Sequence, residues 1–263
     1  MGYIYDILKK QQKEIQIVQK PEKNFSGRMA PLLRYPVKQE FFSDQWMIRD
    51  ILILKENLDA IRIKQGKKIF AFSSARQGEG VTSVVANIAF FWAKSLSVVS
   101  GDLKIVKGRR ILVIDANLEK PGLHTYFQID DGLGLSDFLS GRVNLNLAVR
   151  KISGNNFFLM PAGELNNKIQ LVFSTSKFSN LIKKLEDFFD VILIDTPPIL
   201  NSPITIQIAK ILKNYIIVID AQNTHVSVVK RAMELLKFYN ATTLGVVLNK
   251  RRFYVPENIY KKL

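Results

Sequence analysis

The sequence predicts an α/β fold in which a parallel sheet is covered by helices on both faces. From residue 68 onward, six short apolar runs are unbroken rather than alternating, which is typical of strands buried on both faces. Segments with apolar residues at helical spacing lie between most of these runs, as expected of right-handed βαβ units. The predicted strands are 69–72, 111–114, 157–160, 191–194, 215–219 and 244–248. The predicted helices between them are 82–95, 176–188, 203–212 and 225–238.

The chain is expected to hold one main domain with a basic segment at each end. Residues 1–44 are polar and interrupted by prolines, which predicts a tail or linker. Helical spacing from residue 45 to 64 predicts a helix at the start of a domain that spans 45–250. Residues 251–263 form a second basic tail.

Composition excludes several kinds of chemistry. Of the 263 residues, 47% are hydrophobic and 23% are charged, which is typical of a globular protein. The absence of cysteine excludes disulfides and thiolate metal sites, and two histidines are too few for a histidine-rich metal centre. No apolar run approaches the ~20 residues of a membrane span, and no secretory signal begins the chain, so we expect a cytoplasmic protein.

The net charge of +15 indicates an anionic partner. Nucleic acid, acidic lipid, a polyanionic polymer and nucleotide phosphates all remain open on charge alone. Much of the excess lies at the ends, because residues 1–40 hold eight Lys and Arg against four acidic residues. Residues 249–263 hold five against one, interleaved with aromatic residues, which fits either an interfacial segment at an anionic membrane surface or a solvated basic tail.

A glycine-rich loop follows the first predicted strand and leads into a helix. Small residues let a backbone wrap a phosphate, and a helix N-terminus supplies free N–H groups. In the register of the phosphate-binding P-loop pattern, Gly80 is the second glycine and Thr82 the metal-binding hydroxyl, but Val81 replaces the lysine. The alternative is a simple turn that joins strand to helix. The candidate phosphate contacts are Arg76, Gly78, Glu79, Gly80, Val81, Thr82 and Ser83.

Two aspartates come directly after buried strands. Asp115 follows the second predicted strand and Asp195 follows the fourth. Because ligands of such folds sit at the carboxyl ends of the strands, both carboxylates are expected at the same edge of the sheet. There they suit Mg²⁺, held directly or through water, together with Thr82. One such aspartate is usually a helix cap, but two beside a P-loop-like turn are far more specific.

The joint pattern resembles the P-loop ATPases of the bacterial tyrosine autokinase group, which act in capsule and exopolysaccharide synthesis and are relatives of division-site and partition ATPases. The resemblance covers roughly residues 45–250 and implies a P-loop NTPase fold. The matching segments are Gly78–Ser83, Ile114–Pro121, Gly134–Gly141, Met160–Gly163, Ile194–Pro198 and Gly245–Asn249.

The resemblance also implies ligands and partners. It implies ATP or ADP with Mg²⁺, Asp115 and Asp195 as the catalytic acids if the protein is active, and Asn249 as a hydrogen-bonding partner of adenine. It further implies a membrane-anchored chain-length or export protein as partner, at the inner face of the plasma membrane. A homo-oligomer stays open, and nothing resembling a nucleic-acid-binding module accompanies the motifs.

Departures from the family pattern fall where catalysis is expected. Besides Val81, Asn117 replaces a second aspartate, and Ile204 stands where relatives carry an aspartate. The ring-forming Glu-x-x-Arg-x-x-Arg motif aligns with Arg49, Leu52 and Lys55, so its acid and one arginine are missing. Residues 96–107 form an insertion. The tyrosines near the C-terminus are only Tyr254 and Tyr260, whereas relatives usually carry a denser cluster.

We therefore expect a non-catalytic or weakly active regulator of polysaccharide synthesis or export. Two other readings stay open. The first is an active kinase or ATPase that uses Arg76 in place of the missing lysine, and the second is a partition-type ATPase that binds DNA or membrane.

Overall fold

The computed structural model describes residues 45–94, 97–99, 104–106, 109–153, 156–164, 173 and 176–251. The predicted tails, with Tyr254 and Tyr260, lie outside this part of the chain apart from residue 251. Within the described residues, no helix is both long and apolar enough to cross a membrane.

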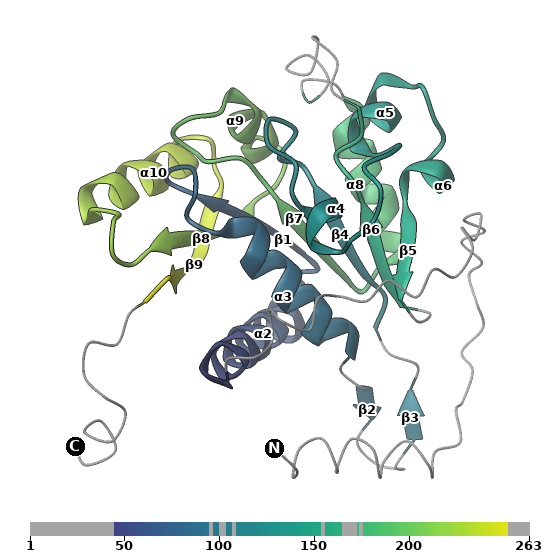
Figure 1. Cartoon of the computed structure of the whole chain (residues 1–263), viewed down its shortest axis with the longest axis horizontal. Helices are drawn as coiled ribbons and strands as arrows, with labels where there is room; N and C mark the ends of the chain where they lie inside the picture. Colours follow the sequence, from purple (N-terminus) through teal and green to yellow (C-terminus); the bar gives the residue numbers. More distant parts are fainter. Residues whose placement is uncertain are drawn as a thin grey trace.

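A seven-stranded sheet forms the centre of the molecule (Figure 1). All neighbouring strands are parallel except the first pair, which is antiparallel. The predicted α/β class and all six predicted strands are confirmed, and the sheet is mostly rather than wholly parallel. In spatial order the strands are β5 (Arg150–Ser153), β6 (Phe157–Met160), β4 (Ile111–Asp115), β7 (Val191–Asp195), β1 (Ile69–Ser74), β8 (Asn214–Asp220) and β9 (Thr242–Asn249).

Helices cover both faces of the sheet, as predicted. The two apolar clusters of the core lie on opposite faces, and alternate strand residues enter one or the other. One face carries α2 (Gln45–Gln65), α3 (Val81–Lys94) and α4 (Leu123–Tyr126). The other carries α5 (Leu135–Ser140), α6 (Leu145–Ala148), α8 (Ser176–Phe188), α9 (Pro203–Ala209) and α10 (Val226–Phe238).

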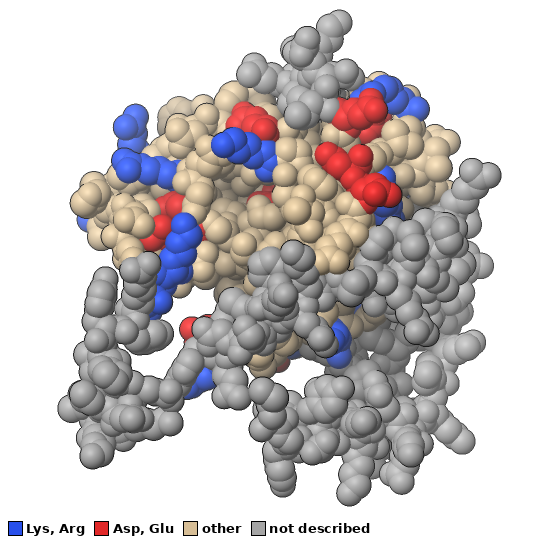
Figure 2. Space-filling view, in the orientation of Figure 1, with Lys and Arg blue, Asp and Glu red and all other residues tan. Residues whose placement is uncertain are grey.

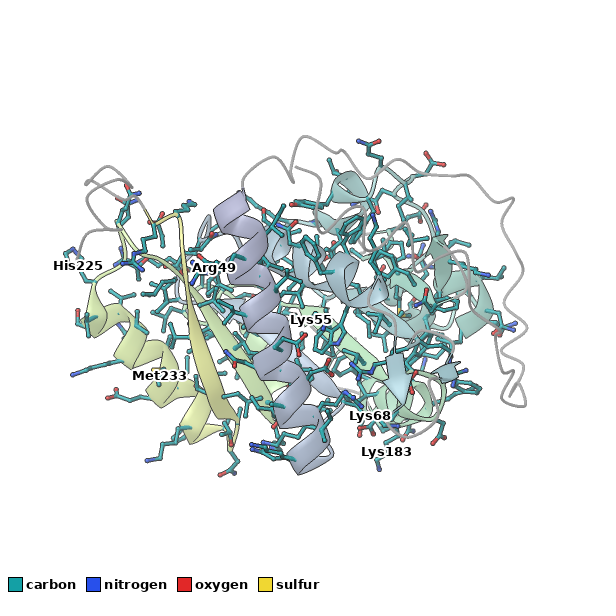
Figure 3. The ribbon with its side chains drawn as sticks, turned by 90° about the horizontal axis from the view of Figure 1, so that it is seen from below. Arg49, Lys55, Lys68, Lys183, His225 and Met233 are labelled. Carbon is teal, nitrogen blue, oxygen red and sulfur yellow. The ribbon has the colours of Figure 1, made fainter. Side chains whose placement is uncertain are left out.

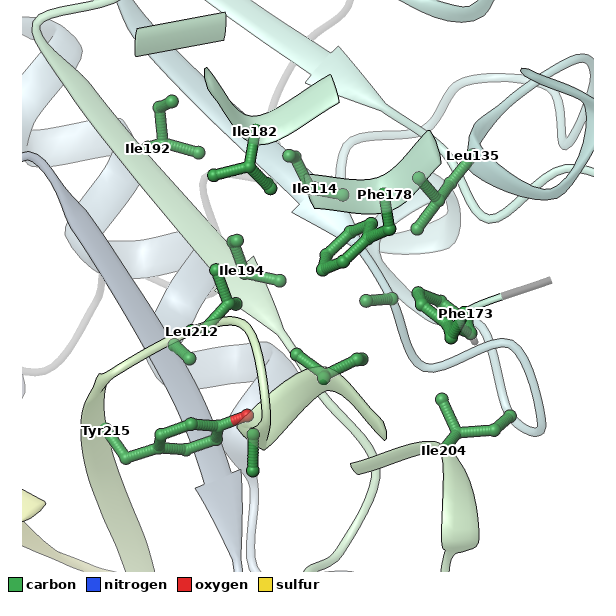
Figure 4. Packing of buried hydrophobic residues seen from close by; sticks show 14 of the residues in the cluster. Ile114, Leu135, Phe173, Phe178, Ile182, Ile192, Ile194, Ile204, Leu212 and Tyr215 are labelled. Atoms are coloured by element: carbon green, nitrogen blue, oxygen red, sulfur yellow. The ribbon is translucent and has the colours of Figure 1, made fainter. Parts of the chain in front are cut away.

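Packing on the second face shows why the central strands read as continuous apolar runs. Ile192 and Ile194 of β7 enter this cluster together with Phe178 and Ile182 of α8 (Figure 4). The intervening Leu193 enters the cluster on the opposite face. Since both faces are covered, every position of such a strand is apolar.

The predicted insertion at 96–107 contains a short hairpin. Its strands β2 (Ser97–Val99) and β3 (Lys104–Val106) pair with each other in an antiparallel sheet that is separate from the main one. The hairpin connects α3 to β4, so it lengthens a crossover without changing the strand order.

A buried aspartate, Asp59, anchors α2 to the rest of the domain. Figure 3 shows this helix with Lys55 labelled, one turn before Asp59. The carboxylate of Asp59 accepts hydrogen bonds from the indole of Trp92 on α3 at 3.2 Å, from Arg62 at 3.0 Å and from Arg109. Lys55, which aligns with the ring-forming motif, is buried and lies 3.7 Å from Asp59. Lys55 therefore has ionic partners within its own chain.

Replacing Asp59 by alanine should destabilise the fold by about 3 kcal/mol, because Trp92 and Arg109 lose their buried acceptor and Lys55 keeps only the exposed Glu56 as an ionic partner among the described residues. Burial alone raises the pKa of Asp59, but the hydrogen bonds from Arg62 and Arg109 outweigh burial and lower it. A lowered pKa means that the ionised carboxylate stabilises the fold at neutral pH and that this contribution is lost as the pH falls below about 4.

Urea denaturation of wild type and Asp59→Ala at pH 7 and pH 3.5 measures how much the ionised carboxylate stabilises the fold. The matched control is Asp50→Ala, which removes an exposed acid from the same helix. Equal effects of the two substitutions at pH 7 would show that Asp59 does not anchor α2.

Candidate functional site

The glycine-rich loop lies between the end of β1 and the start of α3. Gly78 and Gly80 have φ angles of 85° and 90°, a left-handed backbone that favours glycine. A Cβ atom on Gly80 would also collide with the side-chain amide of Asn249. The first α3 hydrogen bond runs from the N–H of Val84 to the carbonyl of Gly80 at 3.1 Å. The loop thus ends at a helix N-terminus, where free N–H groups favour an anion.

Glu79 stabilises the conformation of this loop through its own side chain. Its carboxylate is buried and accepts hydrogen bonds from the N–H of Arg76 at 2.9 Å and from the N–H of Asp220 at 3.4 Å. The hydroxyl of Thr224 donates a third. We predicted Glu79 as a cofactor contact, and in the structure its side chain serves the shape of the loop.

The other loop side chains point to different surroundings. Val81 is buried in the apolar cluster beneath α3. The side chains of Arg76 and Ser83 are exposed. Position 81 therefore supplies apolar packing, while the guanidinium of Arg76 lies at the surface.

Three predicted metal-site residues lie together beside the loop. Asp115 and Asp195 are directly opposite each other in the parallel register of β4 and β7. The hydroxyl of Thr82, in the first turn of α3, donates to Asp195 Oδ2 at 2.6 Å. Asp115 Oδ2 accepts the N–H groups of Gly122 and Leu123, each at 3.0 Å. The sheet register and the start of α3 thus bring these side chains together as predicted.

The two carboxylates share a strongly desolvated environment. Burial raises the pKa of Asp115 to about 6. Burial, and then the nearby charge of Asp115, raise the pKa of Asp195 well above its ordinary value. Asp195 Oδ1 is buried and has no hydrogen-bond partner among the described residues. Two adjacent acids with an unsatisfied oxygen suit a hard divalent cation, since its charge would offset their repulsion.

A divalent cation beside Asp115 and Asp195 would need further oxygen ligands besides the two carboxylates. In the described part of the chain, no group of three or more His, Asp or Glu side chains is arranged to hold a metal ion. The Thr82 hydroxyl, water and a ligand phosphate are oxygen donors of the kind that Mg²⁺ accepts alongside one or two carboxylates.

The two asparagines singled out from the sequence bind backbone groups. Asn117, at the predicted second acidic position, accepts the N–H of Lys120 at 3.2 Å through its side chain. Asn249 donates from Nδ2 to the carbonyl of Glu79 at 2.9 Å. Asn249 therefore connects the end of β9 to the loop, and its contact with adenine stays a prediction.

Two residues next to the loop were not identified from the sequence. Lys250 donates from Nζ to the carbonyl of Gly78 at 2.6 Å and lies 3.2 Å from Asp220 Oδ2. The Asn223 side chain, followed by the N–H of Gln222 and by Lys250, lowers the pKa of Asp220 to about 2. Asp220 ends a buried strand as Asp115 and Asp195 do, and that signal was available in the sequence.

The fold and the site define a P-loop NTPase-like domain: a mostly parallel sheet with a glycine loop between β1 and α3 and two acids at neighbouring strand ends. No family model matches the chain. A search of characterised proteins finds the "Putative tyrosine-protein kinase CapB" of Staphylococcus aureus, 30% identical over 184 residues. The match covers 70% of this chain and 75% of CapB.

Solved structures show the same fold. The VpsO kinase domain superposes with a TM-score of 0.68 at 25% identity, covering 80% of this chain and 99% of VpsO. The kinase domain of the Escherichia coli tyrosine kinase ETK gives 0.72 at 18% identity, covering 95% of each chain. The septum site-determining protein MinD from Pyrococcus horikoshii, solved with Mg-ADP, gives 0.56 at 23% identity, covering 74% of this chain and 76% of MinD.

The chain belongs to the P-loop family of bacterial tyrosine-protein kinases associated with capsule and exopolysaccharide synthesis. The family assignment made from the motifs is thereby confirmed. The roles of the individual site residues stay predictions.

Without metal, the stability of the fold should fall as pH rises from about 4 to above 6. Raised pKa values mean that the folded state binds more protons than the unfolded state in this window, so the free energy of unfolding decreases with pH. In EDTA at pH 8, Asp195→Asn should be more stable than wild type by about 2 kcal/mol, because one buried charge is removed.

Urea denaturation in EDTA at pH 5 and pH 8 tests this. The control is Asp187→Asn, an exposed acid on α8, which should leave the profile unchanged. A wild-type stability that rises over this range would be evidence against the destabilising acid pair.

Proposed function

We propose that the protein is a nucleotide-binding, non-catalytic or weakly active regulator of capsule or exopolysaccharide synthesis or export. The observation that carries this proposal is the contrast within one site. The loop, the Thr82 hydroxyl and the paired acids are in place, whereas position 81 holds a valine that packs into the core.

Nucleotide binding rests on the loop and on the relationship to proteins that bind nucleotides. The glycine loop presents backbone N–H groups at the N-terminus of α3, where ATP or ADP phosphates would bind. Thr82, Asp115 and Asp195 would hold Mg²⁺, and the bound ion would neutralise phosphate charge. MinD, which shares the fold, was solved with Mg-ADP.

The weak or absent catalysis rests on Val81. A lysine ammonium can contact the β- and γ-phosphates, and a charged hydrogen bond of this kind contributes about 1.5–3 kcal/mol. Its loss lowers nucleotide affinity by about 10- to 150-fold. Phosphoryl transfer should suffer at least as much, because charge builds up on the transferred group.

The proposed partner is a membrane-anchored chain-length or export protein at the inner face of the plasma membrane, with an anionic lipid surface as an additional contact. The support is the family relationship together with the basic ends of the chain. On the face drawn in Figure 2, the described Lys and Arg side chains are scattered among Asp and Glu. No broad basic patch on the described part of that face favours binding to DNA.

Calorimetric titration with ATP and ADP, with and without Mg²⁺, tests the nucleotide site. Wild type should bind weakly and in a Mg²⁺-dependent manner, and Val81→Lys should bind at least tenfold more tightly. The matched control, Val81→Met, lengthens the side chain without adding charge and should leave the affinity near that of wild type. If neither wild type nor Val81→Lys bound nucleotide, the proposed site would be wrong.

Phosphotransfer distinguishes the regulator from an active kinase. Purified protein with Mg-ATP and a tyrosine peptide should show little or no transfer of labelled phosphate. Transfer that is lost on Asp115→Ala would establish the active enzyme instead, and additional loss on Arg76→Ala would show that Arg76 replaces the missing lysine.

A further inference from the structure

The phosphate loop is contacted by Asn249, the last residue of β9, and by Lys250, which follows it. Lys250 has a φ angle of 56°, a left-handed backbone that is uncommon for residues other than glycine and asparagine. With this backbone, its side chain extends to the carbonyl of Gly78, 172 positions earlier in the chain. Its neighbour Asn249 donates to the next carbonyl of the loop, that of Glu79. The end of β9 therefore binds two successive peptide groups of the loop.

Two acidic side chains lie next to the backbone of the loop, one from the loop itself and one from the end of β8. Glu79 and Asp220 are both buried, and the N–H of Asp220 donates to the Glu79 carboxylate at 3.4 Å. Negative charge in this position opposes the binding of a phosphate. The ammonium of Lys250 lies within ion-pair distance of one of these acids, 3.2 Å from Asp220 Oδ2.

Lys250 also acts on the group that a phosphate would contact. The carbonyl of Gly78 and the N–H of Glu79 belong to the same peptide unit. A hydrogen bond from an ammonium to that carbonyl polarises the unit and strengthens its N–H as a donor. The Lys250 side chain is 46% exposed, so its charge also faces the solvent from which an anion arrives.

We propose that Lys250 is the loop cation of this chain, meaning the positively charged side chain that helps the loop to bind phosphate. It supplies from the end of β9 the positive charge that position 81 lacks, and it makes the loop selective for the charged phosphates of ATP and ADP over uncharged adenosine. This inference rests on the proposed nucleotide site and adds a residue that determines its affinity and specificity.

Calorimetric titration of the full chain with Mg-ATP, Mg-ADP and adenosine at low salt tests the role of Lys250. Lys250→Gln keeps a hydrogen-bond donor but removes the charge, and it should lower the affinity for ATP about tenfold while leaving that for adenosine unchanged. Lys250→Arg should retain most of the affinity. The matched control is Lys237→Gln, which removes the same charge from an exposed position on α10.

Asp220→Asn provides a readout that a purely structural role would not move. Removing the acid that neutralises Lys250 should raise the affinity for ATP severalfold, and in the Lys250→Gln background it should recover part of the lost affinity. Thermal denaturation of each variant shows that it is folded.

Two results would overturn the proposal separately. If wild type binds ATP and Lys250→Gln binds it no more weakly than Lys237→Gln, Lys250 is not the loop cation and the nucleotide site stands. If folded wild type binds no nucleotide at all, the site itself fails, and Lys250 does not compensate for the missing lysine.

Discussion

The parallel register between β4 and β7 is the constraint on which the site depends. It places Asp115 opposite Asp195 at the carboxyl edge of the sheet, and their backbones cannot separate without breaking the strand pairing. Burial raises the pKa of both acids, so the fold maintains an arrangement that is unfavourable for its own stability. The same edge receives the loop after β1 and the ends of β8 and β9, because all these strands run in one direction.

A second network gives the loop its shape without using the residues of the acid pair. Glu79 binds groups at the start of the loop and at the end of β8, while Asn249 and Lys250 bind two of its carbonyls. The loop is thus fixed by contacts between segments that are 141 to 172 positions apart. The side chains that shape the loop therefore differ from those of the predicted metal site, and Val81, which packs in the apolar cluster, belongs to neither network.

The central part of the fold was predictable because burial on both faces leaves a simple sequence pattern. Val191–Ile194 is apolar at every position for this reason, and the aspartate that follows it marks the edge of the sheet. The edge strand β5 was missed because Arg150 and Lys151 remain partly exposed, so no apolar run marks it. Glu79 and Lys250 could not be placed, since their partners are distant in sequence. Lys250 was counted with the basic C-terminal segment, whereas the structure sets it against the loop.

The bracing of the loop has a consequence for how a ligand would be bound. A flexible glycine loop must lose backbone entropy when it closes around a phosphate, and that cost reduces affinity. Here the side chains of Glu79, Asn249 and Lys250 already impose the curved conformation, so the loss of entropy accompanies folding rather than binding. The loop is preorganised, so a phosphate that bound here would not have to order it first.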